Sequence, residues 1–447
     1  MQPQRRTISD WQRAYAEGQT DPIQATEEAL AAASAASPAF ISMLPERARF
    51  EAEQAANRLK AGRSLGPLDG IPMAWKDLVD VAGTVTTGGS RLFDQPAAAD
   101  APLVAAAQRQ GVISLGKTNM TELAFSGLGM NPHYGTPEYT PGNGPKRVPG
   151  GSSSGSAVAV ARGVVPVAMG SDTAGSLRLP AAFNGLVSWR PSCGLVSTEG
   201  VLPLARSLDT VGAIGHCLED CIAATQAMAG QAVRPLTPGN AGQMTLILDE
   251  VALAEPGLEV AVRDNTLRMA ERFERAGARV VPQHLTAVQQ VLDAIASDGW
   301  LGGFEAYTEH KALLESQPAE RFDPRVRNRL LLVKDAAPDR LVRLIWLRQK
   351  LQQVLAEQLA GAVLLSPTCA RVAPELDPLL LDDDAYLATN LAVLRLTMVG
   401  SFLDTPAVVL PSGTDAQGQY TSVQLSMPRG QDAALLASCL ALTTVCD

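Results

Sequence analysis

The spacing of apolar and polar residues divides the chain into stretches of different character. From Ser9 to about Arg63 the spacing is that of helices, and Asp21-Pro22 is a typical helix start. From about residue 65 the apolar runs become short and are separated by glycine and proline, which predicts buried strands and turns. After roughly residue 235 the glycine content falls and the helical spacing returns.

Individual elements follow from the same spacing. The predicted strands are 112–118, 164–172, 245–250, 362–368 and 405–413. The predicted helices are 100–111, one that begins near Asn119, 257–276 and most of 286–360. The last of these includes a helix from about Asp339 to Leu359, which places five leucines on one face and ends at Gly361. The segment 126–156 is long and irregular, and loops of this length usually have a function.

No internal repeat and no linker-like composition interrupts this order, so one α/β domain is predicted over residues 1–447. Its parts are an N-terminal helical segment at about 8–63, a core at about 65–235, a helical insertion at about 250–360, and C-terminal strands and helices at about 361–447.

Composition narrows the class of protein. Of the 447 residues 46% are hydrophobic, which is ample for a large core. The formal net charge of −9 disfavours a nucleic-acid binder, because such proteins usually carry a basic patch. The N-terminus has no apolar signal segment and no stretch approaches ~20 apolar residues, so neither secretion nor a membrane span is predicted. Six cysteines without a CxxC pair fit buried thiols in a reducing cytoplasm.

Three segments contain polar residues in unusual surroundings. GIPMAWKD places Lys76 in an apolar strand, where a desolvated lysine has a lowered pKa and can act as a base; pairing with Asp77 is the structural alternative. PGGSSSGS, at 149–156, crowds serines at the start of a helix, and its glycines permit close approach to a ligand. A flexible linker or a phosphate-binding loop are alternatives there, although GxxxxGK[ST] is absent. GSDTAGS, at 170–176, ends a strand in a turn whose N–H groups can hold an oxyanion, or it is a plain turn.

The run 151–155 also matches GxSxG, with Ser153 in the position of a nucleophile. That interpretation requires a histidine late in the chain and an acid between the two. None of the four histidines occupies such a position. A serine nucleophile in this chain therefore needs a different base, and Lys76 is the available candidate.

Together the three segments resemble the motifs of the amidase signature family, which has a lysine after GIP, a GGSSGGS loop and a DTGGS turn. Here they read GIPMAWKD, GGSSSGS and SDTAGS, with 76 residues from Lys76 to Ser152 and 24 from Ser152 to Ser176. The resemblance covers most of the chain and is weakest at 235–360. It implies a large, mixed, twisted β-sheet that α-helices cover on both faces, with the catalytic groups at a sheet edge.

The resemblance also implies residue roles. Ser176 would be the nucleophile, Lys76 the base, and Ser152, preceded by a cis peptide bond, the serine that bridges them. The oxyanion hole would consist of the N–H groups of Thr173, Ala174, Gly175 and Ser176. Supporting or substrate-binding roles fall to Ser126, Ser153, Asp172 and Arg178, of which the last two would brace the turn by pairing. No metal and no organic cofactor is implied.

The sequence departs from the family motifs at three positions. Ser154 and Ala174 replace glycines, and Arg190 replaces a more usual lysine. None of these changes removes a catalytic atom, so they affect the expected pocket shape and leave the reaction class unchanged. The pocket itself is expected from 120–135, 300–335 and 370–400.

The predicted activity is hydrolysis of a small-molecule carboxamide to a carboxylic acid and ammonia. The nearest alternative is the glutamine-hydrolysing component of a tRNA-dependent amidotransferase, its A subunit, which releases ammonia from glutamine for a protein partner. Further alternatives are a non-catalytic binding relative and a serine esterase of the α/β-hydrolase type. The sequence specifies neither the amide nor the assembly, and a homodimer is among the assemblies that it permits.

Overall fold

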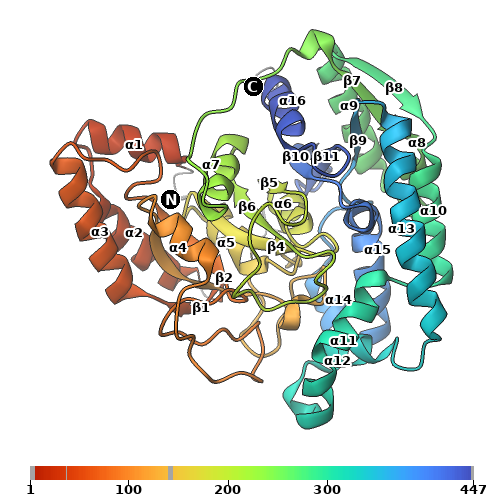
Figure 1. The fold of residues 1–447 in the computed structure, drawn as a ribbon, viewed down its shortest axis with the longest axis horizontal. Coiled ribbons are helices and arrows are strands. Elements are labelled where there is room, and N and C mark those ends of the chain that lie inside the picture. The colour runs from red at the N-terminus through yellow and green to blue at the C-terminus, as the bar shows by residue number, and fades with distance from the viewer. Residues whose placement is uncertain (1–5, 37, 139–143, 444–447) are drawn as a thin grey trace.

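One mixed β-sheet runs through the molecule, and helices lie on both of its faces (Figure 1). The computed structural model describes residues 6–36, 38–138 and 144–443. Its strands are β1 (Phe40–Met43), β2 (Pro72–Lys76), β3 (Ile113–Thr118), β4 (Val167–Asp172), β5 (Val187–Arg190), β6 (Thr210–Gly215), β7 (Thr245–Asp249), β8 (Arg279–Gln283), β9 (Val363–Pro367), β10 (Ala407–Thr414) and β11 (Tyr420–Ser426). Within the described residues the strand order is β1-β3-β2-β4-β6-β5-β10-β11-β9-β7-β8.

The helices fall into an N-terminal group and a larger group that follows the central strands. The first group is α1 (Ile8–Ala16), α2 (Pro22–Ala35), α3 (Pro45–Lys60), α4 (Pro102–Gln108), α5 (Ser154–Ala161), α6 (Arg178–Asn184) and α7 (Leu218–Met228). The second is α8 (Glu250–Leu253), α9 (Val260–Arg275), α10 (Thr286–Ser297), α11 (Leu301–Ser316), α12 (Pro324–Leu331), α13 (Pro338–Leu359), α14 (Leu376–Leu381), α15 (Asp383–Leu403) and α16 (Asp432–Thr443). In Figure 1, α1–α3 lie at one end of the molecule and α10 and α13 at the other.

Alternation along the strands sends side chains into two cores. In β2, Met73 and Trp75 join one core, together with residues of α4 and α7, whereas Ala74 joins the other, together with residues of α5. Successive side chains of a strand point to opposite faces, so a fully buried strand must be apolar on both. All five residues of β2 are buried, which makes the charged Lys76 at its end exceptional.

The predicted strands and most predicted helices are confirmed. Asp21 caps α2 by accepting a hydrogen bond from the Gln24 N–H, and Pro22 is its first residue, as the sequence indicated. α13 buries four leucines and ends at Leu359; the residue that caps it, Ala360, has a left-handed φ of 47° and precedes Gly361. The irregular segment after residue 126 is also confirmed, apart from residues 139–143, which lie outside the described residues.

The helix predicted to begin near Asn119 is wrong. Only a short 3₁₀ turn, η1 (Glu122–Ala124), occurs there, and both Leu123 and Ala124 have positive φ angles of 49° and 58°. The Asn119 side chain accepts a hydrogen bond from the N–H of Met120 (2.7 Å), and such side-chain bonds compete with helix formation.

Helix α15 is long and apolar enough, by length and composition, to cross a membrane. However, 61% of its most apolar window is buried inside the protein. This burial is expected of a core helix. The expectation from the sequence that no stretch is apolar enough to span a membrane was therefore wrong for composition, since α15 is long and apolar enough.

Candidate active site

Lys76 lies at the carboxyl end of β2, between β3 and β4, and its side chain is completely buried. Its Nζ is 2.7 Å from Ser152 Oγ and 2.8 Å from Ser171 Oγ. Burial lowers the pKa of Lys76 to about 7, although the negative charges of Asp172 and Asp209 oppose the shift. A substantial fraction of this amine is therefore uncharged at neutral pH.

Asp77, the structural alternative as a partner for Lys76, forms an ion pair with another lysine. Asp77 pairs with Lys117, with 2.8 Å between Oδ1 and Nζ, and both side chains are fully buried. Asp77 also accepts a hydrogen bond from the Thr87 N–H (3.1 Å). Pairing with Asp77 therefore does not account for the burial of Lys76.

The serine loop approaches Lys76 through a backbone that glycine makes possible. The peptide bond between Gly151 and Ser152 is cis, as the resemblance implied. A Cβ at Gly151 would lie 2.4 Å from the Gly129 nitrogen, so any larger residue would collide with the opposing backbone. Next to it, Ser153 Oγ lies 3.3 Å from both the N–H and the carbonyl oxygen of Ser171.

The turn from Thr173 to Ser176 follows β4 directly, so the ends of two neighbouring strands bring it close to Lys76. In the described part of the chain, the four N–H groups of this turn donate to no protein acceptor. Thr173 Oγ1 donates to Asp209 Oδ1 (2.5 Å), and Thr397 Oγ1 donates to the Ala174 carbonyl oxygen (2.6 Å). The turn is thus held from two sides while its N–H groups stay available.

Three ionic side chains anchor the start of α6 beneath this turn. Arg178 Nε and Nη2 donate to Asp172 at 3.0 and 2.9 Å, and Arg190 Nε lies 3.4 Å from the same carboxylate. All three side chains are fully buried. Burial alone would raise the pKa of Asp172, but the two guanidinium groups hold it at about 2. The expected pairing of Asp172 and Arg178 is therefore present, and Arg190 extends it.

Replacing Asp172 with asparagine is expected to destabilise the protein by about 3–5 kcal/mol, because the buried guanidinium of Arg178 loses the carboxylate that it pairs with, while Arg190 keeps its contact with Asp404 (3.6 Å). Chemical unfolding would measure the change. Glu309→Gln is the matched control, since its partner Arg206 is mostly exposed and such pairs contribute about 0–1 kcal/mol. Because the pKa of Asp172 is lower in the folded state, its contribution is present above about pH 4 and declines as the pH falls through 2. Equal losses in the two variants would contradict this role.

Ser126 belongs to a hydrogen-bonded group on the wall of a cavity. Its Oγ donates to Asn390 Oδ1 (2.8 Å) and accepts from the Tyr386 hydroxyl (2.7 Å). Both partners come from α15, which lies more than 250 residues further along the chain. The supporting or substrate-binding role of Ser126 stays a prediction, and its hydroxyl is already hydrogen-bonded within this group.

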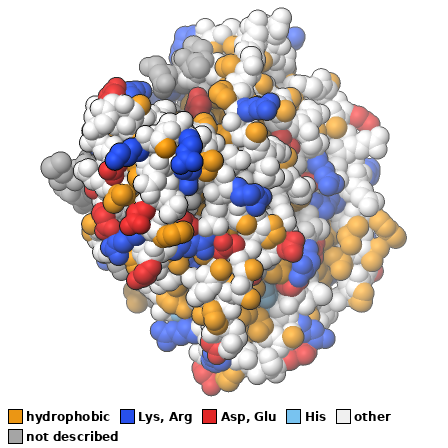
Figure 2. Space-filling view, turned by 60° about the vertical axis from the view of Figure 1, so that its left-hand side comes forward, with side chains coloured by type: hydrophobic (Ala, Val, Ile, Leu, Met, Phe, Trp, Pro, Cys, Tyr) orange, Lys and Arg blue, Asp and Glu red, His pale blue; other side chains and the backbone are white. Residues whose placement is uncertain are grey.

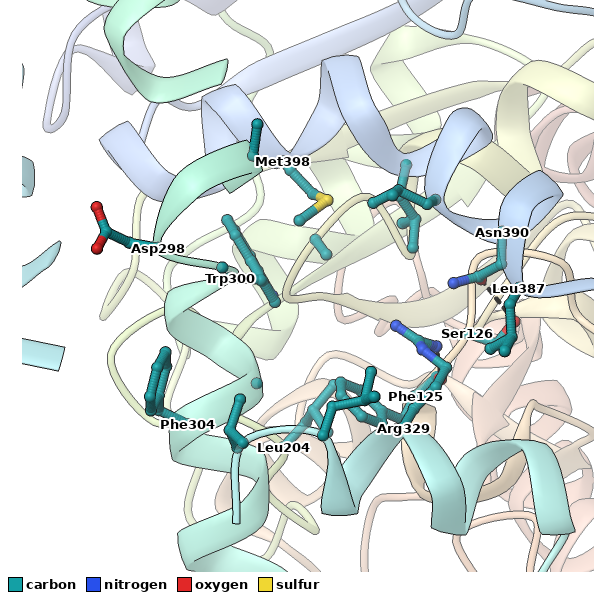
Figure 3. Close-up of a pocket in the computed structure, with 18 of the residues that line it drawn as sticks. Phe125, Ser126, Leu204, Asp298, Trp300, Phe304, Arg329, Leu387, Asn390 and Met398 are labelled. Atoms are coloured by element: carbon teal, nitrogen blue, oxygen red, sulfur yellow. Dashed lines mark hydrogen bonds between the residues drawn. The ribbon is translucent and has the colours of Figure 1, made fainter. Parts of the chain in front are cut away.

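The cavity shown in Figure 3 has a volume of about 580 Å³, and Ser176 is one of its lining residues. Its lining is largely apolar and includes Phe125, Trp300, Phe304, Leu391, Leu394 and Met398. The lining comes from η1, the turn after β4, α10 to α13, and α15, so the expected pocket regions do contribute. None of the four histidines lines it, which gives no support to a serine–histidine pair.

The expected position at a sheet edge is wrong. Lys76 and the turn after β4 lie at the carboxyl ends of β2 and β4, which are interior strands in the order of the sheet. Parallel neighbours bring their carboxyl ends together, and this common end is where α/β proteins usually place a site. β2 and β4 are parallel in this way.

Sequence reasoning missed several residues of the site. Ser171 lies within the GSDTAGS motif and contacts Lys76, but the sequence predicted no role for it. Its position directly before Asp172 was the only feature of the sequence that could have indicated one. Asp209 accepts a hydrogen bond from Thr173 Oγ1, and burial raises the pKa of Asp209 to about 6. Asn390 and Arg329 line the cavity without any local motif that would have indicated them.

Comparison with known proteins agrees with this geometry. The family model described as Amidase matches residues 23–436. A 2-amino-5-chloromuconic acid deaminase of Comamonas testosteroni is 33% identical, covering 89% of this chain and 86% of the relative. The A subunit of the glutamyl-tRNA(Gln) amidotransferase of Synechococcus sp. (strain WH7803) is 31% identical, covering 94% and 92%. A crystal structure of an amidase superposes with a TM-score of 0.84 at 30% identity, covering 97% of this chain and 98% of that one. The chain therefore belongs to the amidase family and is an enzyme that hydrolyses amides.

Proposed function

We propose that Ser176 attacks the carbonyl carbon of a carboxamide, with Ser152 and Lys76 relaying the proton. The 2.7 Å contact between Ser152 Oγ and the buried Nζ of Lys76, whose pKa is about 7, carries the proposal. An amine with this pKa is a competent base near neutral pH. Lys76 takes the proton of Ser152, and Ser152 takes the proton of Ser176. At the same time Ser176 Oγ bonds to the carbonyl carbon.

The remaining steps return the protons. The N–H groups of residues 173–176 stabilise the negative oxygen of the tetrahedral intermediate, and each such donor is typically worth about 3 kcal/mol. Ser152 protonates the leaving nitrogen as the C–N bond breaks, and the proton on Lys76 passes back to Ser152. Water then attacks the acyl-enzyme with the same relay and releases the carboxylic acid. The chain supplies nucleophile, base and oxyanion donors, so the proposed chemistry uses no cofactor.

Ammonia release from a panel of aliphatic, aromatic and amino-acid amides is expected for the purified protein. The panel includes glutamine. Coupled enzymatic detection of ammonia would give kcat/KM for each amide, and the Ser176→Ala variant is the background control. A folded protein that releases no ammonia above this background from any amide would contradict the proposal.

Two other functions are suggested by the relatives. An amidotransferase component would hydrolyse glutamine only with its protein partner, so glutamine turnover that depends on a co-purifying protein would favour it. The relative named as a deaminase suggests an unsaturated amino dicarboxylic acid as a substrate, which therefore belongs in the panel. Ammonia release from that compound in preference to every amide would favour deamination.

The proposed partner is a small-molecule amide, and neither nucleic acid nor membrane is part of the proposal. On the face shown in Figure 2, Lys and Arg side chains are interspersed with Asp and Glu side chains, unlike the basic surface typical of a nucleic-acid binder. We place the enzyme in the cytoplasm, and the free thiols of the five described cysteines support a reducing environment. The mass in solution would test for a homodimer.

A further inference from the structure

The wall of the cavity carries a cation whose charge no described residue balances. Arg329 lies on α12, its guanidinium packs 4.3 Å from the centre of the Phe125 ring, and it donates a hydrogen bond to the Phe125 carbonyl oxygen. Among the described residues no carboxylate lies within ion-pairing distance of it. Arginine keeps its proton in proteins, so this wall of the cavity is positively charged.

A second donor lies on the same wall. Asn390 Oδ1 accepts hydrogen bonds from the Gly127 N–H and from Ser126 Oγ, both at 2.8 Å. Because a backbone N–H can only donate, this contact fixes which side of the amide is the oxygen. The amide NH₂ group is then left without a protein acceptor in the described part of the chain, and in Figure 3 it points into the cavity.

The backbone places the two donors close together. Arg329 binds the carbonyl oxygen of Phe125, and Asn390 binds the side chain of Ser126, the next residue. Tyr386, which donates to Ser126, also lies near Arg329. Arg329 and Asn390 therefore form one polar patch in a cavity that is otherwise mostly apolar.

The cavity offers no matching group for a cation. Asp298 is the one carboxylate among its described lining residues. It pairs with Arg343, 2.8 Å from Nη2 to Oδ1, and points away from the interior in Figure 3. The charge inside therefore favours a ligand with a negative group and disfavours one with an ammonium group.

We propose that the substrate is an amide whose acyl chain is apolar and ends in a carboxylate, such as the monoamide of a dicarboxylic acid. Arg329 and Asn390 bind that carboxylate, and the amide carbon lies at Ser176 on the same cavity. A planar guanidinium is suited to a carboxylate, which it can bind through two hydrogen bonds. This inference rests on the proposed function of Ser176.

The test compares each monoamide, from succinic to suberic acid, with the diamide of the same length. The diamide replaces the carboxylate with a neutral group of nearly the same shape. We expect kcat/KM for the best monoamide to exceed that of its diamide by about 10- to 100-fold, the range of a hydrogen bond to a charged group. We also expect the monoamide of glutaric acid to exceed glutamine, which adds an ammonium group. Equal values for monoamides and diamides would overturn the inference.

Variants connect the preference to the two residues. Arg329→Gln is expected to reduce the monoamide-to-diamide ratio of kcat/KM by about 10- to 100-fold. Asn390→Asp keeps the accepted hydrogen bonds and removes the donors, so it should also reduce the ratio. Arg327→Gln, two residues earlier on α12 and outside the cavity lining, is the matched control and should keep it. A ratio unchanged by Arg329→Gln and Asn390→Asp would refute the assignment.

Binding separates failure of this inference from failure of the proposed function. Calorimetric titration of the Ser176→Ala variant with a monoamide measures affinity without turnover. Monoamide binding at least about 10-fold tighter than diamide binding, and lost on adding Arg329→Gln, supports the carboxylate site even if wild type releases no ammonia. In that case only the catalytic proposal fails. Binding without such a preference overturns the inference, whatever the activity of the wild type.

Discussion

Replacing Ser176 with alanine is expected to lower kcat by on the order of 10⁵-fold, with the fold retained, because removing the nucleophile of a serine hydrolase abolishes the covalent step. The residual rate would come from water attacking a carbonyl that the oxyanion turn still polarises. The measurement is ammonia release at saturating amide, together with a thermal unfolding curve to show that the variant is folded.

The matched control is Ser154→Ala, a serine of the neighbouring PGGSSSGS loop at 149–156. Its hydroxyl is buried at the start of α5 and has no hydrogen-bond partner among the described residues, so its loss should change kcat only a few-fold. If Ser176→Ala kept more than about 1% of the wild-type kcat, the nucleophile would have to be another group, since loss of a serine nucleophile costs far more. If both variants were inactive, the loss of activity in Ser176→Ala could not be assigned to the missing nucleophile.

The central strands could be predicted from the sequence, because the local spacing of apolar residues determines the secondary structure in that part of the chain. β2, β3 and β4 begin with mainly apolar residues close to glycine and proline, and all their residues are buried, as in parallel strands that are covered on both faces. Short edge strands lack such a signal. β1 has four residues between two helices, and β8 contains a proline, so their pairing depends on neighbours that sequence spacing does not reveal.

The residues of the candidate site likewise divide into those that the sequence could indicate and those that it could not. Lys76, Ser152 and Ser176 stand in motifs whose spacing could be recognised, although their roles came from the family resemblance. Lys76 contacts Ser152, which is 76 positions away in the loop before α5. The parallel pairing of β2 and β4 brings the turn that contains Ser176 to the same end of the sheet. Arg329 and Asn390 belong to no recognisable motif. They line the cavity only because the fold packs α12 and α15 against the segment after η1.

The pH profile of wild type should report Lys76. Since burial lowers its pKa to about 7 and only the neutral amine accepts a proton, kcat/KM is expected to rise tenfold per pH unit below 7 and to level off above it. Lys76→Ala should lower kcat/KM by on the order of 10³-fold at pH 8, remove this inflection and leave a rate that increases with hydroxide. An inflection near pH 7 that persists in Lys76→Ala would assign the titration to another group.

Stability provides the control that the lost inflection belongs to this amine rather than to a damaged fold. The folded pKa of Lys76 is about 7, below its usual 10.5, so between these values the unfolded chain binds more protons and the stability of wild type rises with pH. Below pH 7 both states are protonated, and the cost of the buried charge is fully present. Lys76→Met removes this titration, so its gain in unfolding free energy over wild type should be largest at about pH 6 and shrink towards about pH 10. Urea unfolding at both pH values measures that difference, and a gain independent of pH would mean that Lys76 does not titrate in this range. A fold that tolerates such a charge only at a cost retains it for chemistry, and the kinetic plateau and the rise in stability should therefore both begin near pH 7.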